Sequence, residues 1–394
     1  MSVWTDLVRL RGWPDVLGIA LLWFAAVPLG AAPSVAAGAE HSVFVQADGS
    51  LWAWGANGAG QLGEGGKQDR SAPQRIATGY TSVACGQNYT LAIKRDGSLW
   101  AWGDNFWGQL GDGSNTARSS PVLIGSGYSQ VATGGGHTLA LRSDGALWAW
   151  GWNGNGQLGD GTTISRNAPV LIGHGFVRIA AGANHSLAIR KDGSLWAWGS
   201  NALVSGNLLG SSIRQCTGQL GDGGCSDQLR PVPVGAPFSQ IAAGDNFSLA
   251  IRSDGSLWSW GANNFGTDGS RSGLLGDDSG LARNRPLKIG EGYSQVSARG
   301  EHAAAITTQG VLMAWGNNAE GAVGDGSNVD RGVPVVVGEG FVLVAAGYNH
   351  MLAIKRDGSL WAWGSNFAGA LGTGADPAKV RYAPVQIWPQ KSPP

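Results

Sequence analysis

Hydrophobic and polar positions along this chain follow a short pattern that returns seven times. In the unit that begins at Ile179, apolar strands are expected at residues 179–182, 185–189 and 194–198, and a fourth strand begins at residues 231–234. The Asp-Gly pair between the second and third strands suits a hairpin, because glycine supplies the positive φ that tight turns require. Four short strands without helical periodicity predict one antiparallel four-stranded sheet in each unit.

The third strand carries the clearest repeat, Leu-Trp-Ala-Trp-Gly at residues 51–55. Close copies start at Leu99, Leu147, Leu195, Leu257, Leu312 and Leu360, mostly 48 residues apart. A repeat of this length indicates that each copy is one small structural unit. Two tryptophans that are two residues apart point to the same side of a strand. We expect these tryptophans to wedge between neighbouring sheets, each burying roughly 150–250 Å²: Trp52, Trp54, Trp100, Trp102, Trp148, Trp150, Trp196, Trp198, Trp258, Trp260, Trp315, Trp361 and Trp363.

Seven such sheets with both faces covered by apolar strands are typical of propeller blades. The sequence therefore predicts an all-β fold, a seven-bladed β-propeller of four-stranded antiparallel blades, as one domain over residues 33–388. Residues 389–394 are expected to form a C-terminal tail.

The first 32 residues differ from the rest. Arg9 and Arg11 precede an apolar run at residues 16–27, and small residues at 30–32 suit cleavage. This arrangement indicates a signal peptide and an exported protein, secreted or periplasmic. The run is too short for a comfortable membrane span, so we expect none in the mature chain. The alternative is an apolar segment packed on the fold of a cytoplasmic protein.

The charge balance argues against a nucleic-acid ligand. Basic and acidic residues number 27 each, whereas proteins that bind DNA or RNA carry a basic excess or stripe. We expect no nucleic acid among the partners.

Three cysteines are spread unevenly over the chain. Cys85 lies in an apolar strand and is expected to be a small core residue. Cys216 and Cys225 share one loop, nine residues apart, and an exported protein could join them by a disulfide. The cysteines do not have the spacing of a zinc site.

Arginines recur near the expected fourth strand, and acidic residues recur in the preceding loop. Seven near-copies of one such pair favour a structural clamp over a catalytic role. The arginines are Arg70, Arg118, Arg166, Arg230, Arg283, Arg331 and Arg381. The acidic residues are Glu64, Asp112, Asp160, Asp222, Asp277 and Asp325, and Thr373 is the exception.

Five histidines also share one repeat position: His41, His137, His185, His302 and His350. Equivalent positions on packed sheets lie about 10 Å apart, whereas zinc needs nitrogen ligands at about 2 Å. We therefore expect no metal site, and predict that each histidine hydrogen-bonds the backbone of a turn.

The units resemble the regulator of chromosome condensation repeat family. The matching motifs are Gly-x-x-His-Ser-Leu-Ala at 182–188, Asp-Gly-Ser-Leu-Trp-Ala-Trp-Gly at 192–199, Gly-Gln-Leu-Gly-Asp-Gly at 156–161 and Arg-x-x-Pro-Val at 166–170. The resemblance implies a seven-bladed propeller whose two chain ends share a blade. Residues 382–388 would then complete the sheet begun by residues 35–55, which closes the ring by pairing of the N- and C-terminal segments.

The resemblance implies several functions. One branch of the family exchanges nucleotide on a GTPase, and a second senses ultraviolet-B light through a Gly-Trp-Arg-His-Thr signature. This chain has Gly-Gly-Gly-His-Thr at 134–138 and Gly-Ala-Asn-His-Ser at 182–186, without that tryptophan and arginine. A third branch contains secreted propellers that bind other proteins, and the export signal makes this branch the nearest analogue.

We therefore expect a non-enzymatic, monomeric propeller that needs no cofactor and binds another protein through variable loops. Loops held by a rigid scaffold often carry binding residues. The candidates are Trp107, Trp152, Phe265, and Leu203, Val204, Leu208, Leu209 and Ile213 in the longest insert. That insert could instead cover a blade edge and bury its own apolar side chains. An enzyme with a shallow central site and a cytosolic exchange factor or light sensor are the alternative functions, although no nucleophile elbow or phosphate loop occurs.

Overall fold

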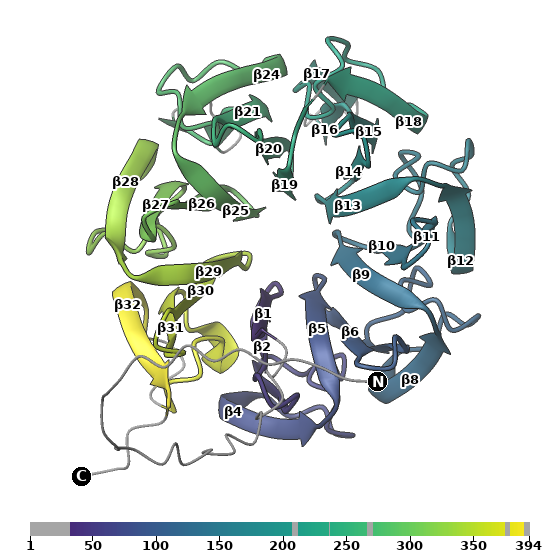
Figure 1. Cartoon of the computed structure of the whole chain (residues 1–394), viewed down its shortest axis with the longest axis vertical. Coiled ribbons are helices and arrows are strands. Elements are labelled where there is room, and N and C mark those ends of the chain that lie inside the picture. Colours follow the sequence, from purple (N-terminus) through teal and green to yellow (C-terminus); the bar gives the residue numbers. More distant parts are fainter. Residues whose placement is uncertain (1–31, 207–211, 236, 266–270, 375–378, 390–394) are drawn as a thin grey trace, which may run out of the picture. The chain divides into compact units, whose positions relative to one another are not determined.

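Seven four-stranded antiparallel sheets follow one another around a ring (Figure 1). The computed structural model describes residues 32–206, 212–235, 237–265, 271–374 and 379–389. The predicted all-β, seven-bladed propeller is confirmed. Blades 1 to 4 consist of β1 (Ser34–Ala37), β2 (His41–Val45), β3 (Leu51–Gly55) and β4 (Arg70–Ala77); β5 (Tyr80–Cys85), β6 (Tyr89–Lys94), β7 (Leu99–Gly103) and β8 (Arg118–Gly125); β9 (Tyr128–Thr133), β10 (His137–Arg142), β11 (Leu147–Gly151) and β12 (Arg166–Gly173); and β13 (Phe176–Ala181), β14 (His185–Arg190), β15 (Leu195–Gly199) and β18 (Gln228–Gly235). Blades 5 to 7 consist of β19 (Gln240–Ala243), β20 (Phe247–Ile251), β21 (Leu257–Gly261) and β24 (Arg283–Gly290); β25 (Tyr293–Arg299), β26 (His302–Thr307), β27 (Val311–Gly316) and β28 (Arg331–Glu339); and β29 (Phe341–Ala346), β30 (His350–Lys355), β31 (Leu360–Gly364) and β32 (Arg381–Trp388).

The ring closes by side-chain packing, and the expected pairing of the two chain ends in one sheet is wrong. β32 pairs with β31 inside blade 7, and β1 pairs with β2 inside blade 1. Each blade is therefore one continuous segment of sequence. Trp388 packs against Trp52 with ring centroids 4.9 Å apart, and the Trp54 indole donates a hydrogen bond to the Ala370 carbonyl at 2.9 Å. The last blade thus meets the first as any blade meets the next.

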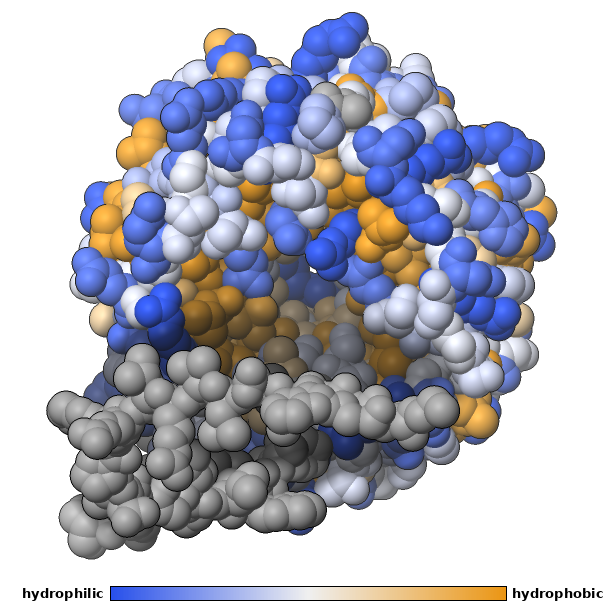
Figure 2. Space-filling view, viewed as in Figure 1, coloured by the Kyte–Doolittle hydropathy of each residue, from blue (hydrophilic) through white to orange (hydrophobic). Residues whose placement is uncertain are grey.

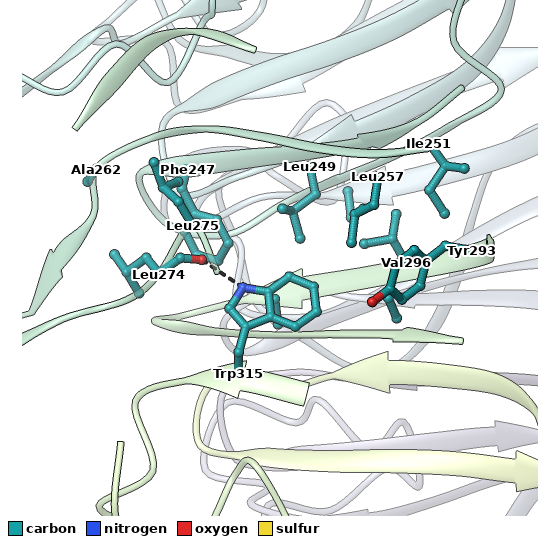
Figure 3. Close-up of a cluster of buried hydrophobic side chains, with 13 residues drawn as sticks. Phe247, Leu249, Ile251, Leu257, Ala262, Leu274, Leu275, Tyr293, Val296 and Trp315 are labelled. Carbon is teal, nitrogen blue, oxygen red and sulfur yellow. Dashed lines mark hydrogen bonds between the residues drawn. The ribbon is translucent and has the colours of Figure 1, made fainter. Parts of the chain in front are cut away.

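The second tryptophan of each repeat joins its blade to the preceding blade. All seven side chains are fully buried, and each indole N–H donates to a loop carbonyl of the preceding blade. In Figure 3, Trp315 of blade 6 donates to Leu274 at 3.0 Å and lies among side chains of blade 5 such as Leu249 and Leu257. The glycine of the Gln-Leu-Gly motif gives the indole room. At Gly111, with φ +80°, a Cβ would lie 2.6 Å from the Trp150 nitrogen.

The first tryptophan of each repeat is only partly buried. In five blades the basic residue at the end of the second strand, or directly after it in blade 5, lies over its ring, at 4.0–4.7 Å from the ring centroid. These are cation–π contacts, which stabilise by about 0.5–1 kcal/mol at exposed sites. The pairs are Lys94 with Trp100, Arg142 with Trp148, Arg190 with Trp196, Arg252 with Trp258, and Lys355 with Trp361.

Four of the five repeated histidines bind a hydroxyl group of the next blade, and the predicted bond to the backbone of a turn is wrong. His185 Nε2 lies 2.9 Å from Ser248 Oγ, whose hydroxyl donates to the Gln219 carbonyl at 2.8 Å. Since the hydroxyl proton is used there, His185 Nε2 must carry the donated proton. Burial lowers the pKa of this imidazole to about 3, so the ring is neutral at pH 7. The other pairs are His41 with Thr90, His137 with Ser186, and His350 with Ser42.

The loop between the third and fourth strands is held by an asparagine and an ion pair. Asn105 is fully buried; its amide donates to Asp112 at 3.1 Å, and its oxygen accepts the Leu110 N–H at 3.0 Å. Arg118 binds Asp112 at 2.7 Å. Burial alone would raise the pKa of Asp112, but hydrogen bonds from Ser114 and Arg118 lower it on balance. Equivalent ion pairs join Arg70 to Glu64, Arg166 to Asp160, Arg283 to Asp277, and Arg331 to Asp325.

Blade 4 departs from the expected clamp. By register, Gln228 and not Arg230 stands opposite Gly199, where blade 3 has Arg166 opposite Gly151. Gln228 donates to Asp222 at 3.2 Å. The assignment of Arg230 was wrong because this strand has two prolines, and the spacing was counted from the second. In blade 7, Arg381 keeps the register position opposite Gly364.

The two long inserts form hairpins beyond the blades. In blade 4, β16 (Ala202–Gly206) pairs with β17 (Ser212–Cys216), and in blade 5, β22 (Asn264–Phe265) pairs with β23 (Arg271–Ser272). The loop of blade 7 holds a short 3₁₀ turn, η1 (Phe367–Gly369). Among the residues that the structure describes, no helix is long and apolar enough to cross a membrane.

Candidate functional site

A central cavity of about 610 Å³ opens where the inner ends of the blades meet. Its walls come from the innermost strand of every blade and from the turns that follow them. Figure 2 shows the centre of the ring hollowed, with apolar side chains gathered around it. The long loops of blades 2 and 3 extend the cavity on one side through Asp104, Trp107, Gln109 and Trp152. The Gly-x-x-His turns and the long loops therefore share one face of the ring, which we call the cavity face.

Several residues at this cavity depart from the repeat. Ala59, Asn155, Glu320 and Ala368 stand where blade 2 has Trp107. At the position of Trp152 the other blades have small or polar residues: Ala56, Asp104, Ser200, Ala262, Asn317 and Ser365. Six blades have glycine where blade 6 has Arg299. Because the same blade forms without these side chains, the fold does not require them.

Trp107 and Trp152 meet at the mouth of the cavity. Their ring centroids are 4.1 Å apart and their planes are tilted by 51°. Phe106 adds an edge contact to Trp107 at 4.7 Å. Phe106 is 67% exposed and Trp107 39%, so large apolar area faces solvent here. A Cβ on Gly136 would lie 3.2 Å from the Trp107 ring, so this glycine lets the indoles approach the turn.

The aromatic loop is held in place by hydrogen bonds to the buried Gln109 and the half-buried Asp104. The Trp107 amide donates to Gln109 Oε1 at 2.8 Å, and Gln109 Nε2 donates to Asp104 at 2.9 Å. The Phe106 amide donates to the other carboxylate oxygen of Asp104 at 3.1 Å. The exposed rings therefore sit on a rigid base, which limits the entropy lost when a ligand binds.

Arg299 spans the cavity from blade 6 to blade 2. Its Nη1 donates to the Cys85 carbonyl at 2.6 Å. Asp245 of blade 5 accepts the Gly300 amide at 3.2 Å and a hydrogen bond from Tyr348 of blade 7. Burial raises the pKa of Asp245, and the charge of Arg299 offsets this only in part. The charge of Asp245 in turn raises the pKa of Tyr348.

The cavity also holds a thiol, which is not activated. Burial raises the pKa of Cys85 to about 12, and the thiolate is the reactive form of cysteine. Within the described ranges, His, Cys, Asp and Glu side chains do not gather in groups that could hold a metal ion. The wall of the cavity contains two carboxylates, one guanidinium and an aromatic pair.

The structure brings together two of the predicted binding residues, Trp107 and Trp152. Leu203 lies partly buried in β16. Val204 and Ile213 lie in β16 and β17, and Phe265 lies in β22, but their side chains are outside the described part. Leu208 and Leu209 lie outside the described residues altogether. Cys216 and Cys225 form the disulfide considered above, with Cα atoms 5.1 Å apart.

Sequence reasoning missed the polar half of the site. Asp104, Asp245 and Tyr348 stand at positions that vary from blade to blade, and Arg299 was noted only as a departure from glycine. A comparison of the seven units position by position would have found all four, since each is unlike its equivalents. The same comparison shows Asn two residues after the third-strand glycine in every unit, which marks the buried loop asparagine.

Comparisons with known proteins agree with this architecture. The solved structure of human WBSCR16 superposes with a TM-score of 0.72 at 22% identity, covering 86% of this chain and 94% of that one. Prp20p from Saccharomyces cerevisiae superposes with a TM-score of 0.73 at 23% identity, covering 88% of each chain. The Arabidopsis thaliana ultraviolet-B receptor UVR8 is 37% identical over 105 residues, 25% of this chain and 23% of that protein. The match to this curated relative thus spans about a quarter of its length.

Family models cover most of the ring. Models described as a regulator of chromosome condensation (RCC1) repeat match residues 238–267, 309–354 and 341–370. A model described as an RCC1-like domain matches residues 28–234, which is more than half of the chain. The protein is therefore a member of the RCC1-like propeller family.

Proposed function

We propose that this protein is a non-enzymatic propeller that binds another protein through its cavity face, with Trp107 and Trp152 as anchors. One observation carries the proposal: Trp107, Trp152 and Arg299 each depart from the repeat, and all three line a single cavity. Functional sites bring unlike residues together in one place, whereas residues repeated in every blade maintain the fold.

The residue types favour a protein partner. Tryptophan and arginine are enriched among the residues that dominate the energy of protein interfaces. A cluster of exposed aromatic side chains on a protein surface often marks an interaction site. Prp20p binds Gsp1p and histones, which supports the view that a propeller of this fold can serve as a protein-binding surface.

The experiment is a capture assay with purified protein and extract of the source cells. The test variant is Trp107→Ala with Trp152→Ser, because blades 1 and 7 have alanine at the first position and blades 4 and 7 have serine at the second. The control is Phe367→Ala, which removes a 61% exposed aromatic from the position in blade 7 that Phe106 has in blade 2. We expect partners identified by cross-linking mass spectrometry to be lost from the test variant and kept by the control. Capture that survives the double substitution would refute the proposal.

The blade 4 hairpin is a second proposed contact. Its test replaces residues 202–217 by the Gly-Asn dipeptide that blade 3 has between Asn153 and Gly156, together with Cys225→Ser. Reduced capture with an unchanged melting temperature is the expected result. A drop in melting temperature without a change in capture would show that the hairpin only covers a blade edge.

Export from the cytoplasm is also part of the proposal. The disulfide between Cys216 and Cys225 supports an oxidising compartment. Mass spectrometry of the mature N-terminus from fractionated cells should find a chain that begins near residue 33, outside the cytoplasm. An intact N-terminus in the cytoplasmic fraction would contradict export, and light scattering on the same sample tests the expected monomer.

A further inference from the structure

The Trp107 indole separates two hollows of the surface. One side belongs to the central cavity, and the other to a rim pocket of about 340 Å³ lined by Asn115 and residues 165–170. The two hollows therefore form one path from the centre of the ring, across Trp107, to the outer edge of blades 2 and 3. An extended chain with a rise of about 3.3 Å per residue fits such a path.

Two carboxylates and two guanidinium groups line this path, and both guanidinium groups already have partners. Asp104, Asp245 and Arg299 are the charged residues of the cavity wall. Arg299 is engaged by the Cys85 carbonyl and lies close enough to Asp245 to lower its pKa. Arg166 in the rim pocket is paired with Asp160 at 2.9 Å. Asp104 accepts hydrogen bonds only from neutral groups, the Phe106 amide and Gln109, among the described residues.

The two indoles beside Asp104 also lack a cation. Elsewhere the protein places Lys or Arg over five half-buried tryptophans, at 4.0–4.7 Å from the ring centroid. Within the described part of the chain, no basic side chain lies over Trp107 or Trp152. An aromatic pair in the same cavity wall as a carboxylate without an ion-pair partner is an arrangement that attracts an ammonium or guanidinium group.

We propose that the path from the central cavity to the rim pocket binds an extended peptide segment of the partner, and that a Lys or Arg of this segment lies against Trp107 and Trp152 with its charge facing Asp104. This inference rests on the proposed function and adds the chemistry of the ligand. A sugar chain suits the site less well, because the two indole rings are tilted by 51° and Phe106 stands on edge against Trp107, so the rings offer no flat platform.

The experiment measures binding of blocked pentapeptides, Gly-Ser-Xaa-Ser-Gly, by NMR on the intact propeller. Xaa is arginine, lysine, citrulline or glutamate; citrulline has the shape of arginine without its charge. The indole N–H signals of Trp107 and Trp152 are assigned with Trp107→Ala and Trp152→Ser. We expect both signals to shift with the arginine and lysine peptides. The citrulline peptide should bind about tenfold more weakly, and added salt should reduce the difference.

Asp104→Asn removes the charge with little change in shape. Blade 6 has Asn317 at this position, where it accepts the Ala319 amide at 3.0 Å as Asp104 accepts the Phe106 amide. The bond to the Phe106 amide should therefore persist, whereas the amide nitrogen of asparagine cannot accept the second bond, from Gln109 Nε2. An unchanged melting temperature would show that the loop keeps its fold without that second bond. We expect the affinity for the arginine peptide to fall about tenfold and the preference over citrulline to disappear.

Equal binding of arginine and citrulline peptides, or unchanged binding by Asp104→Asn, would overturn the inference. Cellohexaose that shifts the same two indole signals more strongly than the arginine peptide would also overturn it. Partner capture that is lost in the double tryptophan variant but unchanged in Asp104→Asn would overturn this inference alone and leave the proposed function standing. Capture that neither variant weakens would overturn the proposed function.

Discussion

The contact between blades 4 and 5 and the contact between blades 6 and 7 use the same tryptophan but different polar bonds. Trp260 donates to Gln219 at 2.9 Å in the first contact, and Trp363 donates to Ala322 at 2.9 Å in the second. Between blades 4 and 5, His185 binds the hydroxyl of Ser248. By register, Met351 occupies the place of that serine in blade 7, and His302 Nε2 has no hydrogen-bonding partner in the described structure.

The difference shows which part of the blade contact is essential. Tryptophan is kept in all seven contacts, whereas the pair of histidine and hydroxyl is absent in three. In one of these three, between blades 2 and 3, Tyr89 stands in place of the histidine. Blade 5 has Phe247 in place of the histidine, and blade 6 has Ala303 in place of the hydroxyl, so both partners change together there. Between blades 6 and 7, the amides of Val344 and Ala346 bind Gln295 and Ser297 instead, at 3.2 and 3.0 Å. Polar bonds between blades are therefore exchangeable, and the indole is not.

Replacing the buried tryptophan in either of these two blade contacts should have the largest effect on stability. Trp260→Ala and Trp363→Ala each empty a fully buried site and leave a carbonyl without its donor. We expect each to lower the free energy of unfolding by about 3–5 kcal/mol, measured by denaturant titration. The two losses should agree within about 1 kcal/mol. A much smaller loss for Trp363→Ala would show that the contact between blades 6 and 7 depends on its own polar bonds.

Lowering the pH should reduce the free energy of unfolding through the histidines of both contacts. Burial lowers the pKa of His185 to about 3 and that of His302 to about 4, from an ordinary value of 6.5. The unfolded chain therefore binds more protons than the folded one between these values and 6.5. Their contribution to stability is complete above pH 6.5 and is lost as the pH falls towards the folded pKa.

Variants that each remove one of the two histidines separate their contributions in the same experiment. His185→Phe with Ser248→Ala copies the Phe247 and Ala303 pair, and should reduce the slope of the unfolding free energy against pH by about 1.4 kcal/mol per unit between pH 5.5 and 3.5. His302→Phe should give the same reduction above pH 4 and little below it. Wild-type stability that stays constant from pH 7 to pH 4 would contradict charged histidines as the cause.

At neutral pH the two histidines should respond to phenylalanine with opposite signs. His185→Phe loses the bond to Ser248, and we expect a loss of about 1 kcal/mol. His302→Phe removes a buried ring nitrogen that makes no hydrogen bond within the described structure, and we expect a gain of about 1 kcal/mol. Thermal melting of both variants against wild type is sufficient. Two losses of equal size would mean that His302 is as well satisfied as His185.

The sequence alone predicts the features that all seven units share and fails where one unit differs. The repeated tryptophan motif predicts seven blades because every blade needs one indole that packs against the preceding blade. The expected pairing of the two chain ends was wrong because the sequence does not show which strand the C-terminal segment pairs with. In the structure Trp388 lies opposite Leu360, so this strand belongs to blade 7. Trp107 and Trp152 were found as exposed loop aromatics, but their contact with each other and their place beside Asp104 depend on how two blades pack.

The smallest effect concerns the tryptophan that blade 6 has lost. Met313 stands in place of the half-buried tryptophan, and Thr307 in place of the cation that covers it in five other blades. The two changes belong together, because a cation without its ring, or a ring without its cation, loses the contact. Thr307→Arg and Met313→Trp should therefore each be nearly neutral alone, while the double variant gains about 0.5–1 kcal/mol of coupling. A double-mutant cycle of unfolding free energies measures this directly. Additive effects would show that the basic residues over the tryptophans elsewhere in the ring contribute solubility and not stability.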